Sequence, residues 1–257
     1  MDPDLHLLTV DIGNTQTGGA VFAGERIERY FTLSSSRERT ADEWEVLFAY
    51  FLNSARIQAA VFISVVPPIG VNVHRALTNL GMAPQMLSPR HLNLMEIRLD
   101  RPFEVGADRI VNAFAARELY GAPVVVVDLG TATTWDVVDR KGDFLGGAIA
   151  PGIEPATRVL AESTAKLPKV RIERPHVAIG RNTINAMESG IYYGTVGAIE
   201  GLSRRIAREL GDAPKVIATG GWAELIAQDC EGIDVVDPHL VHKGLRLIYQ
   251  RLHARQP

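Results

Sequence analysis

The segment VVVVDLGT at residues 124–131 is the clearest indication of the fold, because a fully apolar run ends there on a carboxylate and a glycine follows. The stretch LHLLTVDIGNT at residues 5–15 has the same order. Each apolar run has the length of a buried strand, and turn residues and further apolar segments follow both. Both halves then continue with a helix, a strand and a helix. We therefore predict a duplicated α/β domain with a cleft between the two copies.

The spacing of apolar and turn residues predicts the elements of each half. In the first half we expect strands at 5–10, 20–22, 26–33, 59–65 and 85–87, and helices at 40–53 and 70–80. The first of these helices opens with a capping box, Thr40 and Glu43. In the second half we expect helices at 107–119, 154–163, 183–210, 223–229 and 241–252, and strands at 124–127, 134–138, 144–150, 215–218 and 234–236. Residues 88–102 read as a long connection, and we place the domains at 1–103 and 104–257.

The composition is that of a globular enzyme. The 257 residues include 27 basic and 30 acidic side chains, for a formal net charge of −3. This balance argues against nucleic acid as a main partner, because phosphate backbones are bound by basic faces. The single cysteine, Cys230, excludes an internal disulfide framework and indicates a reducing compartment, the cytoplasm. The acidic start and the lack of an apolar run of about 18 residues predict neither a targeting segment nor a membrane span.

The first strand end carries groups that suit a nucleotide phosphate. Asp11 follows the strand, Gly13 permits a tight turn, and Asn14 and Thr15 offer side-chain groups beside exposed backbone N–H groups. Asp11 is placed to hold a hydrated Mg²⁺ ion rather than to touch phosphate directly. The alternative is that Asp11 only caps a β-turn, and the pentapeptide by itself does not separate the two interpretations.

Similar strand ends recur in the second half. Asp128 is followed by Gly130 and several hydroxyls, a glycine-rich turn is expected at residues 146–152, and TGG at 219–221 follows another apolar strand. Ligands of open α/β sheets bind outside the carboxyl ends of strands, so we expect these ends to face one crevice. The chain has no GxxxxGK[S/T] string and no GxGxxG after a strand, which excludes a Walker P-loop and disfavours a dinucleotide.

GADR at residues 106–109 opens a predicted helix. Asp108 could accept the proton of an attacking hydroxyl, and Arg109 could clamp an anion, as phosphoryl transfer requires. The simpler alternative is that Asp108 complements the helix dipole. The tetrapeptide alone favours this simpler role.

Taken together, these motifs resemble those of type III pantothenate kinases. The segments that occur in the family's order are DIGNT (11–15), SVVPP (64–68), GADR (106–109), DLGTAT (128–133), GGAIAPG (146–152), GRNT (180–183) and TGG (219–221). The resemblance extends from about residue 7 to about residue 250. Single motifs are shared with the wider acetate kinase/sugar kinase/Hsp70/actin superfamily, whereas the combination with GADR is specific to this family.

The resemblance implies a fold and an activity. The family has two ribonuclease H-like domains with mixed sheets flanked by helices and an inter-domain cleft, and it forms homodimers. It uses ATP to phosphorylate pantothenate at its terminal hydroxyl. The product is 4'-phosphopantothenate, and the reaction is the first step of coenzyme A biosynthesis.

The resemblance also implies roles for individual residues. Asp108 would accept the hydroxyl proton, Asp128 would hold the K⁺ or NH₄⁺ ion that the family requires, and Mg²⁺ would accompany ATP near Asp11. The implied ATP-binding residues are Asp11, Ile12, Gly13, Asn14, Thr15, Gln16, Thr17, Gly18 and Thr131. The implied pantothenate-binding residues are Gly106, Ala107, Asp108, Arg109 and Thr183, the last from across the dimer interface. The chain departs from the family at Leu99, where a Tyr usually touches substrate, so we expect a more apolar pocket.

The long predicted helix carries glycines on one face. Gly190, Gly194, Gly197 and Gly201 are spaced by four, three and four residues. Each costs helix propensity of about 1 kcal/mol relative to Ala, so the close approach of another backbone is the expected compensation. That backbone belongs either to a twin subunit or to another helix of the same chain, and the resemblance favours the dimer.

Other residues with reactive side chains are expected to be structural. His239 and His242 lie three residues apart without a carboxylate to complete a metal set, so we expect surface or capping roles for them. Cys230 has no neighbouring base and is expected to be a spectator.

Two other functions remain open. One is a non-catalytic, regulatory relative that binds ATP and assists transcription, although the complete set of Asp11, Asp108, Arg109 and Asp128 argues against it. The other is a kinase for a different small hydroxyl or carboxylate substrate, which Leu99 would permit. ATP binding without turnover would favour the first, and a panel of acceptor alcohols would detect the second.

Overall fold

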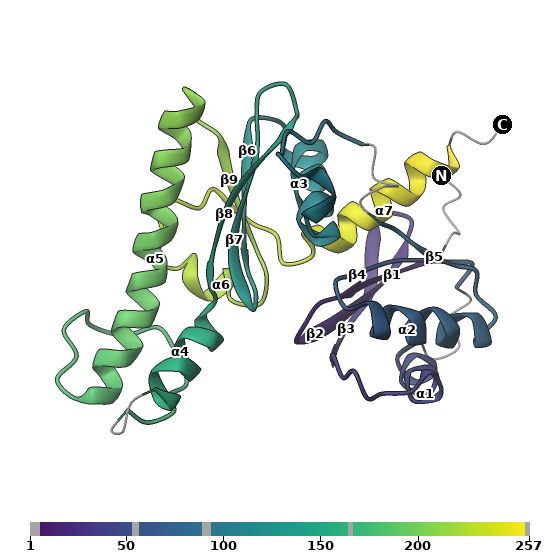
Figure 1. The fold of residues 1–257 in the computed structure, drawn as a ribbon, viewed down its shortest axis with the longest axis horizontal. Coiled ribbons are helices and arrows are strands. Elements are labelled where there is room, and N and C mark those ends of the chain that lie inside the picture. Colours follow the sequence, from purple (N-terminus) through teal and green to yellow (C-terminus); the bar gives the residue numbers. More distant parts are fainter. Residues whose placement is uncertain (1–5, 53–56, 89–93, 164–166, 255–257) are drawn as a thin grey trace. The chain divides into compact units, whose positions relative to one another are not determined.

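The structure is a computed structural model that describes residues 6–52, 57–88, 94–163 and 167–254. The chain forms two compact units, one of residues 1–94, 101–115 and 241–257, the other of residues 95–100 and 116–240. Each unit contains one five-stranded sheet with helices against it (Figure 1). The predicted strand start at residue 5 and helix end at residue 53 lie outside the described residues.

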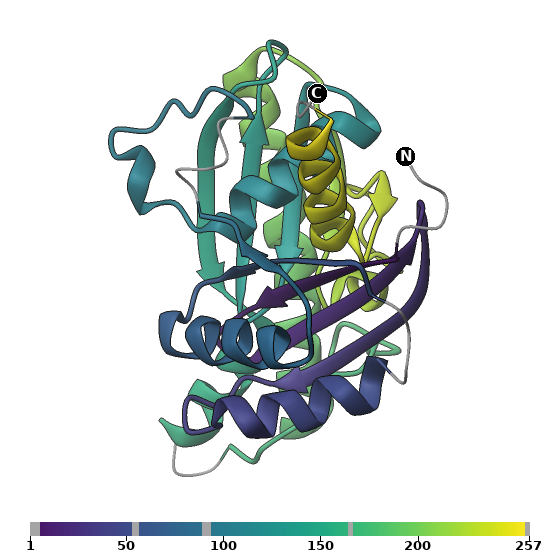
Figure 2. The same cartoon turned by 90° about the vertical axis from the view of Figure 1, so that its right-hand side faces the viewer.

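The first sheet is built around the strand that carries Asp11. β1 (His6–Ile12) is antiparallel to β2 (Gln16–Ala23), which is antiparallel to β3 (Arg26–Ser34). On its other side β1 is parallel to β4 (Ala59–Ser64), which is parallel to β5 (Pro84–Met86). α1 (Ala41–Leu52) and α2 (Pro67–Asn79) cover one face (Figures 1 and 2). Trp44 and Phe48 from α1 and Val73 from α2 form a core there with alternate residues of β1, such as Val10 and Ile12.

The second sheet repeats this plan. β6 (Val124–Leu129) is antiparallel to β7 (Ala132–Val138), which is antiparallel to β8 (Phe144–Pro151). On its other side β6 is parallel to β9 (Lys215–Thr219), which is parallel to β10 (Val235–Val236). The helices of this unit include α4 (Ile153–Glu162), the long α5 (Thr183–Leu210), which packs on Val125, Val127 and Trp135, and the short α6 (Ala223–Ile226).

The two strand orders are the same when read in one direction. The first sheet runs β3-β2-β1-β4-β5 and the second β8-β7-β6-β9-β10, with two antiparallel pairs followed by two parallel pairs in each. The predicted α/β class, with two duplicated mixed sheets flanked by helices, is therefore confirmed.

α3 (Ala107–Tyr120) and α7 (Leu240–His253) lie side by side (Figure 2). A Cβ atom on Gly244 would stand 2.8 Å from the carbonyl oxygen of Val111 and 3.0 Å from the Cβ of Ala115. Only glycine permits this approach between helices. Most of α7 and the first turns of α3 consequently belong to the first unit. The division differs from the sequence-based domains of 1–103 and 104–257, because contacts between segments so far apart leave no local signal.

Helix ends follow their capping chemistry. In the predicted capping box of α1, the backbone N–H of Thr40 donates to Glu43 Oε2 (2.7 Å) and that of Glu43 donates to Thr40 Oγ1 (3.3 Å). α2 begins at Pro67 rather than at residue 70, since proline suits a first helical turn. α6 ends at Ile226, earlier than expected. In the described part of the chain, no helix is both long and apolar enough to span a membrane.

Candidate active site

The turn between β1 and β2 forms the predicted phosphate loop. Ile12 pairs with Thr17, and the N–H of Gly13 donates to the carbonyl of Gln16 (3.0 Å), which leaves Asn14 and Thr15 at the exposed tip. Gly13 does not have a positive φ. Glycine suits this position because a Cβ atom there would stand 3.0 Å from the Gln16 oxygen across the turn.

The members of this loop divide into two groups. Asn14, Thr15 and Gln16 are exposed and can offer groups to a ligand. Ile12 belongs to the apolar core, and the buried Thr17 places its hydroxyl 2.9 Å from Ser35 Oγ. These two residues hold the hairpin rather than face solvent.

His242 supports this hairpin from the opposite face of the sheet, a role that the sequence analysis missed. It is 2% exposed, and its Nδ1 lies 2.9 Å from Thr9 Oγ1, while its ring meets that of Tyr30 edge-on at 5.6 Å. A Cβ atom on Gly18 would stand 3.0 Å from His242 Nε2. The expected surface or capping role for His242 is therefore wrong. Its partners come from β1, β2 and β3, so no residue near it in the sequence indicated them.

Asp108 lies in the first turn of α3. Its Oδ1 accepts the backbone N–H of Arg109 (2.8 Å), and a Cβ atom on Gly106 would overlap the same oxygen. Glycine at 106 therefore makes this carboxylate position possible. Burial raises the pKa of Asp108, and the N–H and charge of Arg109 limit the rise. A carboxylate of this kind is a better proton acceptor near neutral pH than an exposed one.

In the second unit, Gly130 and Gly220 lie beside the carboxylate of Asp128 at the end of β6, and Gly152 lies against the backbone of the β6–β7 turn. We call Gly130, Gly152 and Gly220 the glycine cradle. A Cβ atom on Gly220 would stand 2.5 Å from Asp128 Oδ1, and one on Gly152 would stand 2.6 Å from the carbonyl oxygen of Thr131. The expected gathering of strand ends is thus present here for β6, β8 and β9. The carboxylate and the nearby backbone carbonyls are oxygen donors, which suit a hard cation.

The expected glycine-rich turn at 146–152 is mostly strand. β8 spans Phe144–Pro151, so only Gly152 reaches the cradle. Gly147 pairs with Asp136 further along the strand. Gly146 lies against Leu99, because a Cβ atom on Gly146 would stand 2.9 Å from Leu99 Cδ2. Leu99 therefore packs on β8.

Thr183 is the exposed first residue of α5. The side chain of Asn182 caps this helix by accepting the N–H of Asn185 (2.9 Å). Thr183 also borders an apolar hollow of about 510 Å³. The other residues that line the hollow are Leu160, Leu167, Ala186, Met187, Gly190 and Ile191.

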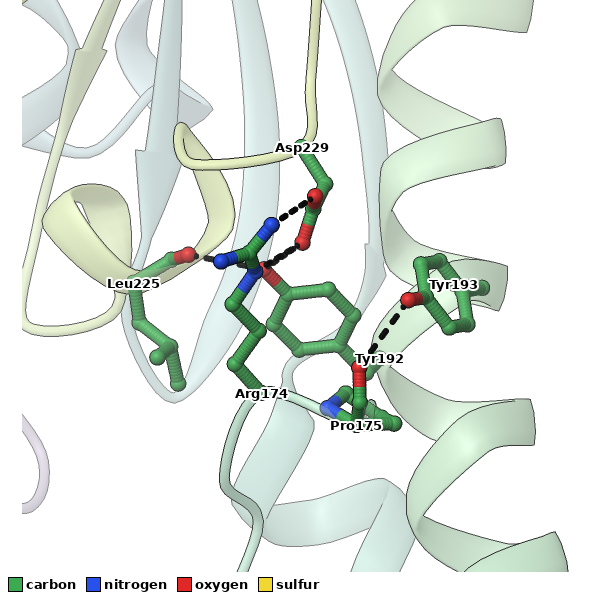
Figure 3. Close-up of polar contacts among 6 residues, drawn as sticks. All are labelled: Arg174, Pro175, Tyr192, Tyr193, Leu225 and Asp229. Atoms are coloured by element: carbon green, nitrogen blue, oxygen red, sulfur yellow. Dashed lines mark hydrogen bonds and ion pairs between the residues drawn. The ribbon is translucent and has the colours of Figure 1, made fainter. Parts of the chain in front are cut away.

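The predicted site residues thus fall into two sets. The loop of residues 11–18 and the GADR segment lie in the first unit, and Asp128, Thr131 and Thr183 lie in the second. The second unit also contains a polar cluster that was not predicted, formed by Arg174, Tyr192 and Asp229 (Figure 3). These residues lie on three separate segments, so no motif links them.

Solved structures of other proteins share the fold of this chain. A candidate N-acetylglucosamine kinase from Porphyromonas gingivalis superposes with a TM-score of 0.52 at 12% identity, over 96% of this chain and 99% of its own. A candidate Baf family transcriptional activator from Campylobacter jejuni superposes with a TM-score of 0.63 at 21% identity, over 96% of this chain and 99% of its own. The fold is that of the actin-like ATPases and sugar kinases.

The model of the type III pantothenate kinase family matches residues 7–205. A type III pantothenate kinase from Geobacter sulfurreducens is 45% identical over 251 residues, covering 95% of this chain and 98% of that protein. The chain belongs to the type III pantothenate kinase family, a family of kinases.

Proposed function

We propose that this protein phosphorylates pantothenate with ATP, giving 4'-phosphopantothenate for coenzyme A biosynthesis. The observation that carries the proposal is the placement of Asp108. Its carboxylate lies in the first turn of α3, burial raises its pKa, and Gly106 leaves room for it. The transfer needs such a carboxylate beside the attacking hydroxyl.

The chemical step is a single displacement. The terminal hydroxyl of pantothenate gives its proton to Asp108 as its oxygen bonds to the γ-phosphorus of ATP, and the bond from that phosphorus to the bridging oxygen breaks to release ADP. We assign pantothenate binding to Gly106, Ala107 and Arg109. The guanidinium of Arg109 suits the carboxylate of pantothenate.

The exposed tip of the β1–β2 turn is assigned to the phosphates of ATP. Asn14, Thr15 and Gln16 offer amide, hydroxyl and backbone groups there, and Thr131 adds a further ATP contact. Asp11 lies on the same strand just before the turn and would hold a hydrated Mg²⁺ ion. Bound Mg²⁺ would neutralise charge that develops on the phosphate oxygens.

Asp128 is assigned to a monovalent cation, K⁺ or NH₄⁺. The support is the donor set around the glycine cradle, in which a carboxylate and backbone carbonyls come close together. The bound cation would supply positive charge to this strand end.

A homodimer through α5 is also part of the proposal. Apart from the adjacent residues and the nearby backbone of α5 itself, a Cβ atom on Gly190, Gly194 or Gly197 would meet no atom of the described chain within 4 Å. No described helix of the same chain therefore packs on these glycines, and a second subunit is the remaining explanation for their shared face. Thr183, at the start of this helix, would contact pantothenate bound by the partner. We assign the protein to the cytoplasm, where ATP is available.

The test is turnover by the purified full-length protein. ADP release is measured with pantothenate, ATP and Mg²⁺ in the presence of K⁺, NH₄⁺ or Na⁺, and we expect release that requires pantothenate and either K⁺ or NH₄⁺. A second set of assays replaces pantothenate with other small alcohols and hydroxy acids. ADP release only with another acceptor would reassign the substrate, and ATP binding without turnover would favour the regulatory alternative.

A further inference from the structure

Residues 174–182, which we call the strap, precede α5 and contact its first three turns. The hydroxyl of Tyr193 donates to the carbonyl of Pro175 (3.1 Å), and that of Ser189 donates to the carbonyl of Ala178 (2.6 Å). A Cβ atom on Gly180 would stand 2.5 Å from Ala186 Cα. The strap ends at Asn182, the cap residue of α5.

Polar contacts, rather than buried apolar side chains, hold the strap in place. Its apolar residues Val177 and Ile179 are 59% and 83% exposed. Such side chains contribute little burial energy. The position of the strap therefore depends on its hydrogen bonds, on the close contact at Gly180 and on the ion pair at its first residue.

That ion pair joins Arg174 to Asp229. Arg174 Nε donates to Asp229 Oδ2 and Nη2 donates to Oδ1, both at 2.7 Å, which is the two-point geometry that fixes orientation as well as distance (Figure 3). The Tyr192 hydroxyl lies 2.8 Å from Asp229 Oδ2 and 3.0 Å from the carbonyl oxygen of Leu225. The Arg174 guanidinium, with help from Tyr192, lowers the pKa of Asp229 to about 2, so the pair stays charged at physiological pH.

The cluster connects three segments that lead to proposed site residues. Arg174 begins the strap, which leads to Thr183, and Tyr192 lies on α5 itself. Asp229 follows α6, and α6 follows Gly220 of the glycine cradle. The contacts of Asp229 with Arg174 and Tyr192 therefore connect the strap and α5 to the segment that begins at Gly220, beside Asp128.

We infer that Arg174 is a positioning residue for pantothenate binding, which it supports by holding the strap so that Asn182 and Thr183 keep their places at the start of α5. This inference rests on the proposed function, because it takes Thr183 as a pantothenate contact. Arg174 does not touch substrate in this account. Its effect passes through the strap.

The first test compares steady-state constants of Arg174→Ala, Arg174→Lys and wild type. We expect Arg174→Ala to raise KM for pantothenate about tenfold, because a small misplacement of a binding group is costly, and to change KM for ATP by less than about twofold. Arg174→Lys keeps the charge but loses the two-point geometry, so it should recover part of the loss. The matched control is Arg140→Ala, which removes the surface ion pair with Asp212 in the same unit (2.9 Å).

The second test does not require turnover. Hydrogen exchange of the Asn185 and Ala186 amides, which are bonded to Asn182, should be faster in Arg174→Ala than in wild type and unchanged in Arg140→Ala. Unchanged KM for pantothenate, or an equal rise in both KM values, would overturn the inference. If wild type fails to phosphorylate pantothenate, the proposed function fails and the inferred binding role fails with it. Faster exchange in Arg174→Ala would still show that Arg174 stabilises the start of α5 through the strap.

Discussion

His242 Nδ1 lies 2.9 Å from Thr9 Oγ1, although 233 residues separate the two in sequence. The Thr9 hydroxyl also lies 3.3 Å from the carbonyl oxygen of Ala20 on β2, so the contact connects α7 to both strands that carry the phosphate loop. The loop at residues 13–16 is exposed at its tip, and its support comes from this buried contact behind it.

Replacing His242 should therefore weaken the phosphate loop. His242→Ala leaves Thr9 without this partner and empties a buried ring site, which should cost about 1–3 kcal/mol of unfolding free energy. We also expect KM for ATP to rise more than KM for pantothenate. Thermal unfolding and steady-state kinetics check both effects. The control is His253→Ala at the exposed end of the same helix, and equal effects of the two changes would contradict the role of His242.

Gly220 offers a sharp test of the glycine cradle. It has a φ of 88°, and a Cβ atom there would stand 2.5 Å from Asp128 Oδ1 and 2.7 Å from the carbonyl oxygen of Leu129. Gly220→Ala should lower stability by roughly 1–3 kcal/mol through backbone strain and overlap, and it should raise the K⁺ concentration needed for half-maximal turnover. K⁺ titration of the activity and thermal unfolding provide the readouts.

The neighbouring glycine is the matched control for this change. A Cβ atom on Gly221 would meet nothing within 4 Å, and its φ is not positive. Gly221→Ala should leave both stability and K⁺ dependence near those of wild type. If the two variants behave alike, the cradle does not shape the Asp128 site.

Replacing Asp108 with Asn should lower kcat but raise the stability of the folded protein. Asp108→Asn removes the proposed proton acceptor, so kcat should fall by about 10²–10⁴. Burial raises the pKa of Asp108 above its unfolded value, so folding favours the protonated form. The charged carboxylate therefore lowers stability once the pH exceeds the folded pKa, and that loss is absent below the unfolded value.

The amide variant should consequently unfold at a higher temperature than wild type at neutral pH. The difference should shrink as the pH falls through the raised pKa of Asp108. Unfolding scans across the acidic range, with Glu104→Gln as an exposed control two residues before Gly106, measure this dependence. A stability difference that does not vary with pH would contradict the assigned cause.

The glycine face of α5 should be sensitive to added bulk only if a second subunit covers it. In the single chain, Gly194→Leu meets no described atom at the Cβ position and improves helix propensity by nearly 1 kcal/mol. We therefore expect the variant to keep its fold but to lose the dimer. Light scattering gives the mass, and Arg208→Leu on the same helix is the control. A dimer that persists in Gly194→Leu would exclude this face as the contact.

Local chemistry made several features predictable from the sequence. The capping box of α1 needs only Thr40 and Glu43, because both groups lie within one turn. The strands before Asp11 and Asp128 are apolar runs that end in turn residues, and the common order of both halves correctly predicted the duplicated sheets. Gly106 and Asp108 are near enough in sequence for their joint role to be suspected.

Other features depend on contacts between distant segments. Residues 146–151 form a strand because they pair with β7, which overrode their glycine-rich composition. His242 looked like a surface residue because its partners lie on distant strands, Thr9 on β1 and Tyr30 on β3. Arg174 and Asp229 stand 55 residues apart, and neither has a motif around it.

The class of fold, the repeated strand ends with Asp and Gly, and the family were predictable from the sequence, since these depend on periodicity and on residues that are neighbours along the chain. The folded structure was needed to show which glycines lie beside Asp128, which helix supports the phosphate loop and what anchors the segment before Thr183. Each of these is a packing or hydrogen-bond contact between residues far apart in the sequence. Folding brings the partners together, and the linear pattern of residues does not indicate which distant residues will meet.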